Sequence, residues 1–268
     1  MIPHALCERV LSARVTVFRS ERRTFQPAQQ LAPTVVPTAR LLLIEQGGAE
    51  YHIDGRQLTL SPGQVLLVPA MARRWWQARG GPPFTMSWVE FMFTARAAID
   101  PPAVQLSLAP GAFREALGVY RHIEDAGVIG GQRERLLQEA ELRVLLTRVL
   151  LHPLAESLSL ADAGGAGDDA VRAALAWLER HYATPTPERG LATRVGLSDN
   201  HFRLRFRASV GFNPRAFVLE LRLHAARQLL AAGSLGVKQV AAAVGYRDPL
   251  LFSRLYRRRW GMPPSRDA

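Results

Sequence analysis

The chain has 268 residues, of which 48% are hydrophobic and 21% charged, and this composition excludes an intrinsically disordered protein. Its single cysteine, Cys7, excludes an intrachain disulfide and a cysteine-based zinc cluster. The net charge of +11 lies entirely in residues 171–268, which hold 17 Lys and Arg against 6 Asp and Glu, whereas residues 1–170 are neutral. This division indicates a polyanion-binding module joined to a neutral partner domain.

The N-terminal stretch MIPHALCERVLSARVTVF lacks the basic-then-apolar pattern of a secretory signal. No apolar run approaches the ~18 residues that a membrane-spanning helix needs. We therefore expect a soluble, cytoplasmic protein without a membrane partner.

Residues from about 12 to 95 are predicted to form β-strands. The stretch RLLLIEQGGAEYHIDGRQLTLSPGQVLLVPA has short apolar or alternating runs separated by Gly47-Gly48, Asp54-Gly55 and Pro62-Gly63. Short strands with turns at this spacing are typical of a small antiparallel barrel or jelly roll.

Two helices are predicted next, at GAFREALGVYRHIEDAG and RERLLQEAELRVLLTRVLLHPL, because the apolar period changes within residues 111–152. In the second helix, Leu137, Val144 and Leu145 belong to a wide apolar stripe. We expect this stripe to pack on the barrel, on a second subunit, or on both.

A linker is predicted at residues 156–169, ESLSLADAGGAGDD, because small residues, glycines and acids follow one another there without an apolar period. It separates a sensing and dimerisation domain, residues 1–155, from a helical domain, residues 170–268. The helical domain opens with DDAVRAALAWLERHYA, in which an aspartate cap precedes an apolar helix face.

Residues 191–214 and 240–264 form an internal repeat, which matches at an offset of 49 residues at its start and of 50 thereafter. Each copy has the pattern of a helix-turn-helix: a glycine permits the tight turn, and aromatic side chains four residues apart hold the second helix against the first. The matched pairs are Ala192 and Ala241, Val195 and Val244, Gly196 and Gly245, Phe202 and Phe252, Phe206 and Tyr256, Arg207 and Arg257, Gly211 and Gly261, and Pro214 and Pro264.

The second helix of each copy is expected to turn its other face outward, where arginine can read guanine and asparagine can read adenine in a major groove. The alternative is a solvated face of a helical bundle. We favour DNA because two copies occur in the part of the chain that holds all the net charge. The predicted DNA-binding residues are Asn200, Arg203, Leu204, Arg207, Arg247, Leu250, Ser253, Arg254, Arg257 and Arg258.

Residues 171–266 resemble the DNA-binding domain of AraC/XylS-type transcription regulators. The resemblance is carried by LATRVGLSDNHFRLRF, LRLHAARQLL, VKQVAAAVGYRD and FSRLYRRRWGMPP. It implies seven helices, with two recognition helices in adjacent major grooves of double-stranded DNA. Arg205 departs from the family pattern, which has an apolar residue there. The resemblance assigns base contacts to Asn200, Arg203, Leu204, Pro249, Leu250, Ser253 and Arg254.

The segment GRQLTLSPGQVLLVPAMARRWW resembles the cupin-like sensor domain of the same family. The histidines common near the positions of Arg74 and Glu90 are absent, and only His4 and His52 precede residue 100, so neither a metal site, a cofactor nor a catalytic site is expected. Aromatic side chains and arginines could instead bind an effector with a carboxylate, or simply pack the core and the barrel rim. The ligand-binding candidates are Arg40, Arg74, Trp75, Trp76, Trp88 and Glu90.

These patterns predict an α+β protein: a cupin-like antiparallel β-barrel with two following helices, then an all-α domain with two helix-turn-helix motifs. We interpret it as a sequence-specific transcription regulator of the AraC family and not an enzyme, with a small-molecule effector in the barrel, a homodimeric state and a contact to RNA polymerase. We expect an activator, although the sequence does not decide between activation and repression. The alternatives are a ligand-free or partner-controlled regulator and a cupin enzyme with a DNA-binding tail.

Overall fold

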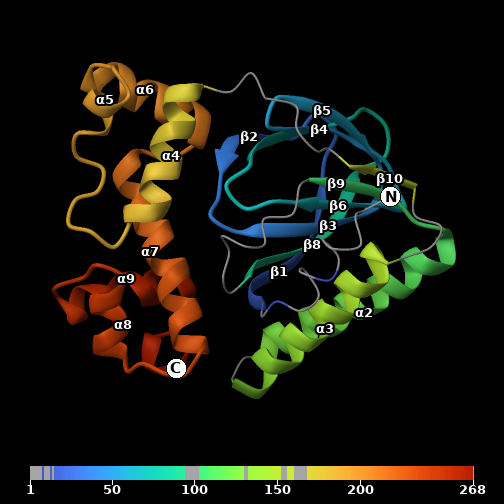
Figure 1. The fold of residues 1–268 in the computed structure, drawn as a ribbon. Coiled ribbons are helices and arrows are strands. Elements are labelled where there is room, and N and C mark those ends of the chain that lie inside the picture. The colour runs from blue at the N-terminus through green and yellow to red at the C-terminus, as the bar shows by residue number, and fades with distance from the viewer. Residues whose placement is uncertain are drawn as a thin grey trace. The chain divides into compact units, whose positions relative to one another are not determined.

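The computed structural model describes Glu8, Ala13 and residues 15–93, 103–129, 132–151, 156–159 and 168–267. Apart from the short segment 33–37, the residues before the predicted linker form one compact unit, and residues 168–267 belong to another. The first unit contains antiparallel sheets and two helices, and the second is helical (Figure 1). The predicted α+β class, with helix-turn-helix motifs in the second part, is confirmed.

The strands of the first unit form two sheets of antiparallel pairs. The larger sheet has the order β1-β8-β3-β6-β9-β10, and the smaller has the order β2-β7-β4-β5. The strands are β1 (Val15–Phe25), β2 (Gln30–Val35), β3 (Ala39–Gln46), β4 (Ala49–Ile53), β5 (Arg56–Leu60), β6 (Gln64–Val68), β7 (Arg73–Ala78), β8 (Phe84–Phe93), β9 (Val104–Ser107) and β10 (Glu156–Ser159).

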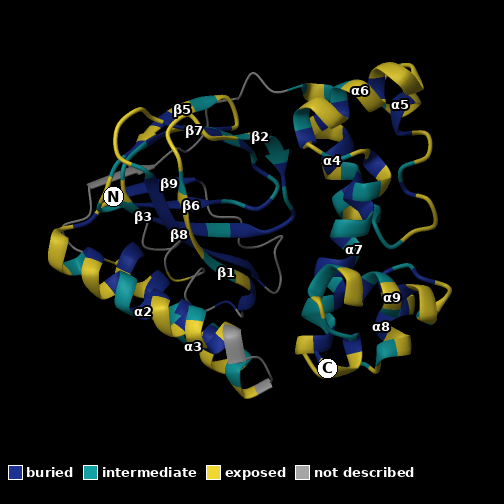
Figure 2. Ribbon diagram, turned by 180° about the vertical axis from the view of Figure 1, so that it is seen from behind, coloured by how far each residue is buried: buried dark blue, intermediate teal, exposed yellow. Residues whose placement is uncertain are grey.

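Strand β3 is buried on both faces because successive side chains of its run LLLI point to opposite sides of the larger sheet. Leu41 and Leu43 join a core shared with the following helices, whereas Leu42 and Ile44 join the core shared with the smaller sheet. The burial view shows the resulting dark core strands (Figure 2). The predicted turn at Asp54-Gly55 is present, and Gly55 has a φ of +84°.

The two predicted helices of the first unit are α2 (Pro110–Ile129) and α3 (Gln132–Leu150), which lie side by side (Figure 1). The apolar stripe expected on α3 is divided between two faces. Leu145 is fully buried in the core, whereas Leu137 and Val144 are 50% and 42% exposed. Leu151, just after the helix, is 49% exposed. Leu137, Val144 and Leu151 recur every seven positions and, with the exposed Leu136 beside them, form a second stripe that faces solvent.

The predicted linker at 156–169 is wrong at both ends. Glu156–Ser159 forms strand β10, which pairs antiparallel with β9. Asp168 caps helix α4 (Asp169–His181), because its side chain accepts a hydrogen bond from the Val171 amide. Residues 160–167 lie outside the described part of the chain. Four residues with one leucine have too little pattern to predict a strand, and distant β9 supplies the pairing.

The second unit continues with α5 (Leu191–Arg194), α6 (Asp199–Val210), α7 (Pro214–Ala231), α8 (Val237–Ala243), α9 (Pro249–Trp260) and the short 3-10 helix η2 (Pro264–Arg266). Helix α7 is shared by both repeats. Its first half contacts α6 through Phe217, whose ring lies 6.0 Å from that of Phe206. Its second half joins the core of α8 and α9 through Leu223 and Leu230. One helix therefore ties the two repeats into a single unit.

Candidate functional site

Four glycines of the repeat take the same left-handed backbone conformation in both copies. In the turns before the second helices, φ is +72° at Gly196 and +90° at Gly245. At the ends of those helices, φ is +82° at Gly211 and +78° at Gly261. Glycine adopts such angles with far less strain than other residues, so the repeat in sequence is also a repeat of backbone geometry.

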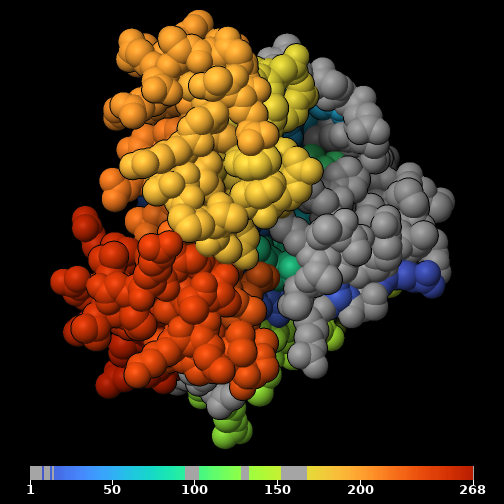
Figure 3. All heavy atoms as spheres, turned by 60° about the vertical axis from the view of Figure 1, so that its left-hand side comes forward, coloured from blue at the N-terminus to red at the C-terminus, as the bar shows by residue number. Residues whose placement is uncertain are grey.

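The aromatic pairs of the repeat fix which faces of α6 and α9 are buried. The rings of Phe202 and Phe206 lie 5.4 Å apart, and those of Phe252 and Tyr256 lie 5.6 Å apart. All four side chains are buried in the second unit. The opposite face of each helix is therefore turned outward, at the two ends of the unit that are orange and red in the space-filling view (Figure 3).

Nearly all the predicted DNA-binding side chains lie on these outward faces or next to them. Leu204 and Leu250 are 63% and 76% exposed, although both are large and apolar. Ser253 is half-buried, and its hydroxyl donates a hydrogen bond to the Pro249 carbonyl at 2.9 Å. The exposed members of the set are Asn200, Arg203, Leu204, Arg207, Arg247, Leu250, Arg254, Arg257 and Arg258.

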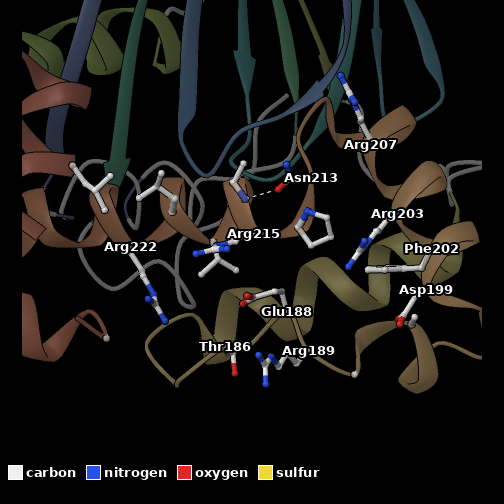
Figure 4. A pocket seen from close by; sticks show the side chains of 18 of the residues that line it. Thr186, Glu188, Arg189, Asp199, Phe202, Arg203, Arg207, Asn213, Arg215 and Arg222 are labelled. Atoms are coloured by element: carbon white, nitrogen blue, oxygen red, sulfur yellow. Dashed lines mark hydrogen bonds between the residues drawn. The ribbon is translucent and has the colours of Figure 1, made fainter. Parts of the chain in front are cut away.

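A groove runs between the two repeats, with lining from the loop before α5, from α6 and from the start of α7 (Figure 4). The turn before α9 also lines it. Arginines outnumber acids in the lining by two to one, so the groove carries a positive potential suited to phosphate. The charged lining residues are Arg189, Arg203, Arg207, Arg215, Arg222, Arg247, Glu188, Asp199 and Asp248.

The start of α7 is a part of this groove that the predicted set of DNA-binding residues does not include. Asn213 caps the helix by accepting a hydrogen bond from the Ala216 amide at 2.8 Å, and Arg215 is exposed in its first turn. An asparagine cap followed by proline and arginine was the signal available in the sequence.

Several arginines of the second unit instead hold the fold together. The side chain of Arg205, whose position departs from the family pattern, donates to Asp168 at 2.5 Å and so reaches the cap of α4. Arg222 donates to the carbonyls of Tyr182 and Thr184 at 2.7 and 2.8 Å, which fastens the loop after α4 to α7. Net charge therefore overstates the number of arginines free to bind DNA.

Replacing Asp168 with alanine is expected to lower the free energy of unfolding of the second unit by about 1–2 kcal/mol, because the change removes both a helix cap and the partner of Arg205. DNA affinity should stay unchanged at temperatures where the unit is folded. Thermal unfolding and DNA titration of the full chain measure the two effects. The matched control is Asp169→Ala, which removes an exposed neighbouring acid but not the cap.

In the first unit, five of the six ligand-binding candidates point between the two sheets together with Tyr51. Glu90 is buried and accepts hydrogen bonds from Thr38 at 2.8 Å and from Arg40 at 3.1 Å. Arg74 is only 1% exposed, and it interacts electrostatically with Arg40, Tyr51 and Glu90. Burial lowers the pKa of Arg74 to about 10, with Arg40 contributing in the same direction. The interior therefore holds a cluster of buried charges.

The tryptophans of this part of the chain are divided between two faces. Trp76 and Trp88 are buried in the core between the sheets. Trp75 does not join them, because alternation along β7 turns it away from that core, and its ring stacks on His52 at 3.5 Å. Tyr51, which the sequence interpretation missed, occupies an inward position of β4 directly opposite Trp76.

A family model described as the AraC-like ligand binding domain matches residues 20–176, which is more than half of the chain. The chain belongs to the AraC family. A second model, described as a helix-turn-helix domain, matches residues 191–267. This AraC-family protein is a DNA-binding transcription regulator with an N-terminal ligand-binding domain.

Relatives of this AraC-family protein match most of its length. It is 32% identical over 240 residues to the MmsAB operon regulatory protein of Pseudomonas aeruginosa, covering 84% of this chain and 70% of that one. It is 24% identical over 232 residues to the HTH-type transcriptional activator RhaS of Klebsiella pneumoniae, covering 84% and 82%. The structure of ToxT from Vibrio cholerae aligns with 93% of this chain and 97% of its own, at 10% identity and a TM-score of 0.41.

Among the helices of the described ranges, none combines the length and the hydropathy needed to cross a bilayer. Within the same ranges, no three His, Cys, Asp or Glu side chains are grouped so that they could share a metal ion.

Proposed function

We propose that this regulator binds duplex DNA through α6 and α9 in two successive major grooves, and that its bases are read by the exposed residues of those helices. The observation that carries the proposal is the shared geometry of the two repeats, which presents Arg203 and Arg254 on outward faces at the two ends of one helical unit. Arginine donates bidentate hydrogen bonds to guanine, and the exposed Asn200 can pair in the same way with adenine.

Helix α7 sets the distance between the two recognition helices. Its 18 residues span about 27 Å at the rise of an α-helix, which is close to the ~34 Å that separates successive major grooves on one side of a duplex. The positive groove between the repeats then faces the intervening phosphates. Arg215, exposed at the start of α7, supplies a positive charge for that contact.

The ligand-binding domain is proposed to control DNA occupancy by a population shift, in which an effector favours one of two arrangements of the protein. The activating role named in the relative RhaS supports activation of transcription through RNA polymerase. A non-enzymatic role and a cytoplasmic location belong to the same proposal, since the relatives are regulators and the ligand is DNA.

Selection of random duplex DNA on the full-length protein, at two salt concentrations, tests the proposed binding mode. We expect a motif with two boxes about one helical turn apart. If the selected DNA shows no motif and binding weakens steeply with salt, the proposed binding mode is contradicted.

We further propose that the protein is a homodimer held by the exposed stripe of α3. Leu137, Val144 and Leu151 recur every seven residues, the period at which two helices pack along a common seam. Leu137→Glu is expected to raise the dimer dissociation constant by at least about tenfold, because it places a carboxylate from each copy at the seam. Sedimentation over a range of protein concentrations measures this dissociation constant. The control Gln57→Glu makes an equal charge change at an exposed position of β5 and should leave the dissociation constant unchanged.

A further inference from the structure

The interior of the ligand-binding domain holds buried polar groups that the fold leaves without hydrogen-bond partners. Among the described residues, the terminal nitrogens of Arg74, Nε of Arg40 and the indole nitrogen of Trp88 have no hydrogen-bond partner. All three side chains point into the space between the two sheets. Arg74 does share a side-chain hydrogen bond with Tyr51. A buried donor without a partner costs stability, and a buried unpaired charge costs more, so such groups call for a functional explanation such as a bound ligand.

The charges of this cluster do not balance. Arg40 forms an ion pair with Glu90, whose other oxygen is bonded to Thr38. Among the described residues, no second carboxylate forms a salt bridge with Arg74, although Asp54 acts electrostatically on the neighbouring Tyr51. Burial raises the pKa of the Tyr51 phenol, even though Arg74 and Arg40 act in the opposite direction, so Tyr51 stays neutral and does not offset the charge.

The two arginines of the cluster lie near the ends of their strands. Arg40 and Arg74 are each the second residue of their strands, β3 and β7. Arg40 is paired with Val68, the last residue of β6, and Arg74 is paired with Ile53, the last residue of β4. A ligand could therefore reach the two guanidinium groups from the strand ends without passing the whole apolar core.

We propose that the effector is a small carboxylate with an apolar body, whose two oxygens bind the terminal nitrogens of Arg74. This inference rests on the proposed effector control of the regulator and names the chemical class of the effector. A carboxylate has one charge and two oxygens in a plane, which match one unbalanced guanidinium. A phosphate would bury nearly two charges against that single one. Trp76 and Trp88 provide apolar surface beside it.

The first arm of the test needs no ligand. Arg74→Met in the full chain replaces the unpaired charge with an apolar side chain of similar length, so we expect a Tm higher than that of the wild type by roughly 2–4 °C. Arg79→Met, an exposed position just after β7, should not change the Tm. A fall in the Tm of Arg74→Met would overturn the proposal, because it would show that Arg74 already has its partners within the fold.

The second arm uses benzoate, phenylacetate and hexanoate, each beside its uncharged amide, and inorganic phosphate, at roughly 10 mM and constant ionic strength. We expect at least one carboxylate to raise the Tm of the wild type and of Arg79→Met, and to lose this effect in Arg74→Met. The proposal would be overturned if no carboxylate raised the Tm or if phosphate alone did. It would also be overturned if the amides raised the Tm as the carboxylates do, or if the increase persisted in Arg74→Met. DNA selection on ligand-free protein does not depend on Arg74, so the DNA-binding proposal can succeed or fail separately.

Discussion

Replacing Arg254 with alanine is expected to weaken binding to the cognate DNA site by about 1–3 kcal/mol and to relax the base preference at one position. Arg254 is exposed in the middle of α9, where a guanidinium reaches base edges when the helix lies in a major groove. Replacing Arg257, one turn later, is expected to weaken binding equally on all sequences and to lower the salt slope by about 1, because a residue near the helix end contacts phosphate.

Titration of labelled duplexes by fluorescence anisotropy separates these two effects. The cognate site and its single-base variants are measured at three salt concentrations with each protein. Arg180→Ala serves as the control, because Arg180 is exposed on α4 and does not line the groove. If Arg254→Ala and Arg257→Ala change affinity and specificity alike, the side of α9 that faces the major groove of the DNA has been assigned incorrectly.

The turn glycines of the two repeats are expected to respond very differently to alanine. At Gly196 the added methyl group meets no atom within 4 Å, so Gly196→Ala should cost only the left-handed strain of about 1–2 kcal/mol. At Gly245 the same methyl group would collide with the Ala183 carbonyl, which belongs to the loop that Arg222 fastens. Because of this collision, Gly245→Ala should lower the free energy of unfolding by about 1–3 kcal/mol more than the left-handed strain alone.

Urea unfolding followed by circular dichroism measures this difference on the full chain and on each variant. The two substitutions are chemically identical and occupy equivalent positions of the repeat, so the comparison isolates the effect of the surroundings. Equal destabilisation would mean that the loop at Ala183 moves away at little cost. A larger effect at Gly196 would contradict the packing described for the second unit.

The helices of the second unit could be predicted because their signals are local. The glycines, the aromatic pairs and the caps Ser198 and Asp248 all lie within a few residues of the elements they define, and the repeat supplies each signal twice. The assignment of individual residues to base or phosphate stays a prediction, since it depends on the DNA.

Features that depend on distant parts of the chain could not be predicted. Strand β10 exists because it pairs with β9, which lies some fifty residues earlier. Arg205 was unexplained in the sequence because its partner, Asp168, is 37 residues away. Alternation along β7 separates Trp75 from Trp76, but only the packing of the two sheets decides which of them is buried.

The two repeats share a scaffold but present different chemistry on it. At the offset of 50 residues, Asn200 corresponds to Leu250, Arg203 to Ser253 and Leu204 to Arg254. With the base contacts proposed above, α6 and α9 prefer different base pairs, which gives a binding site a left end and a right end. The protein lies on such a site in one direction only. A promoter with its site inverted in place would bind the regulator with the same affinity but present it backwards, so occupancy would be kept while transcription control was lost.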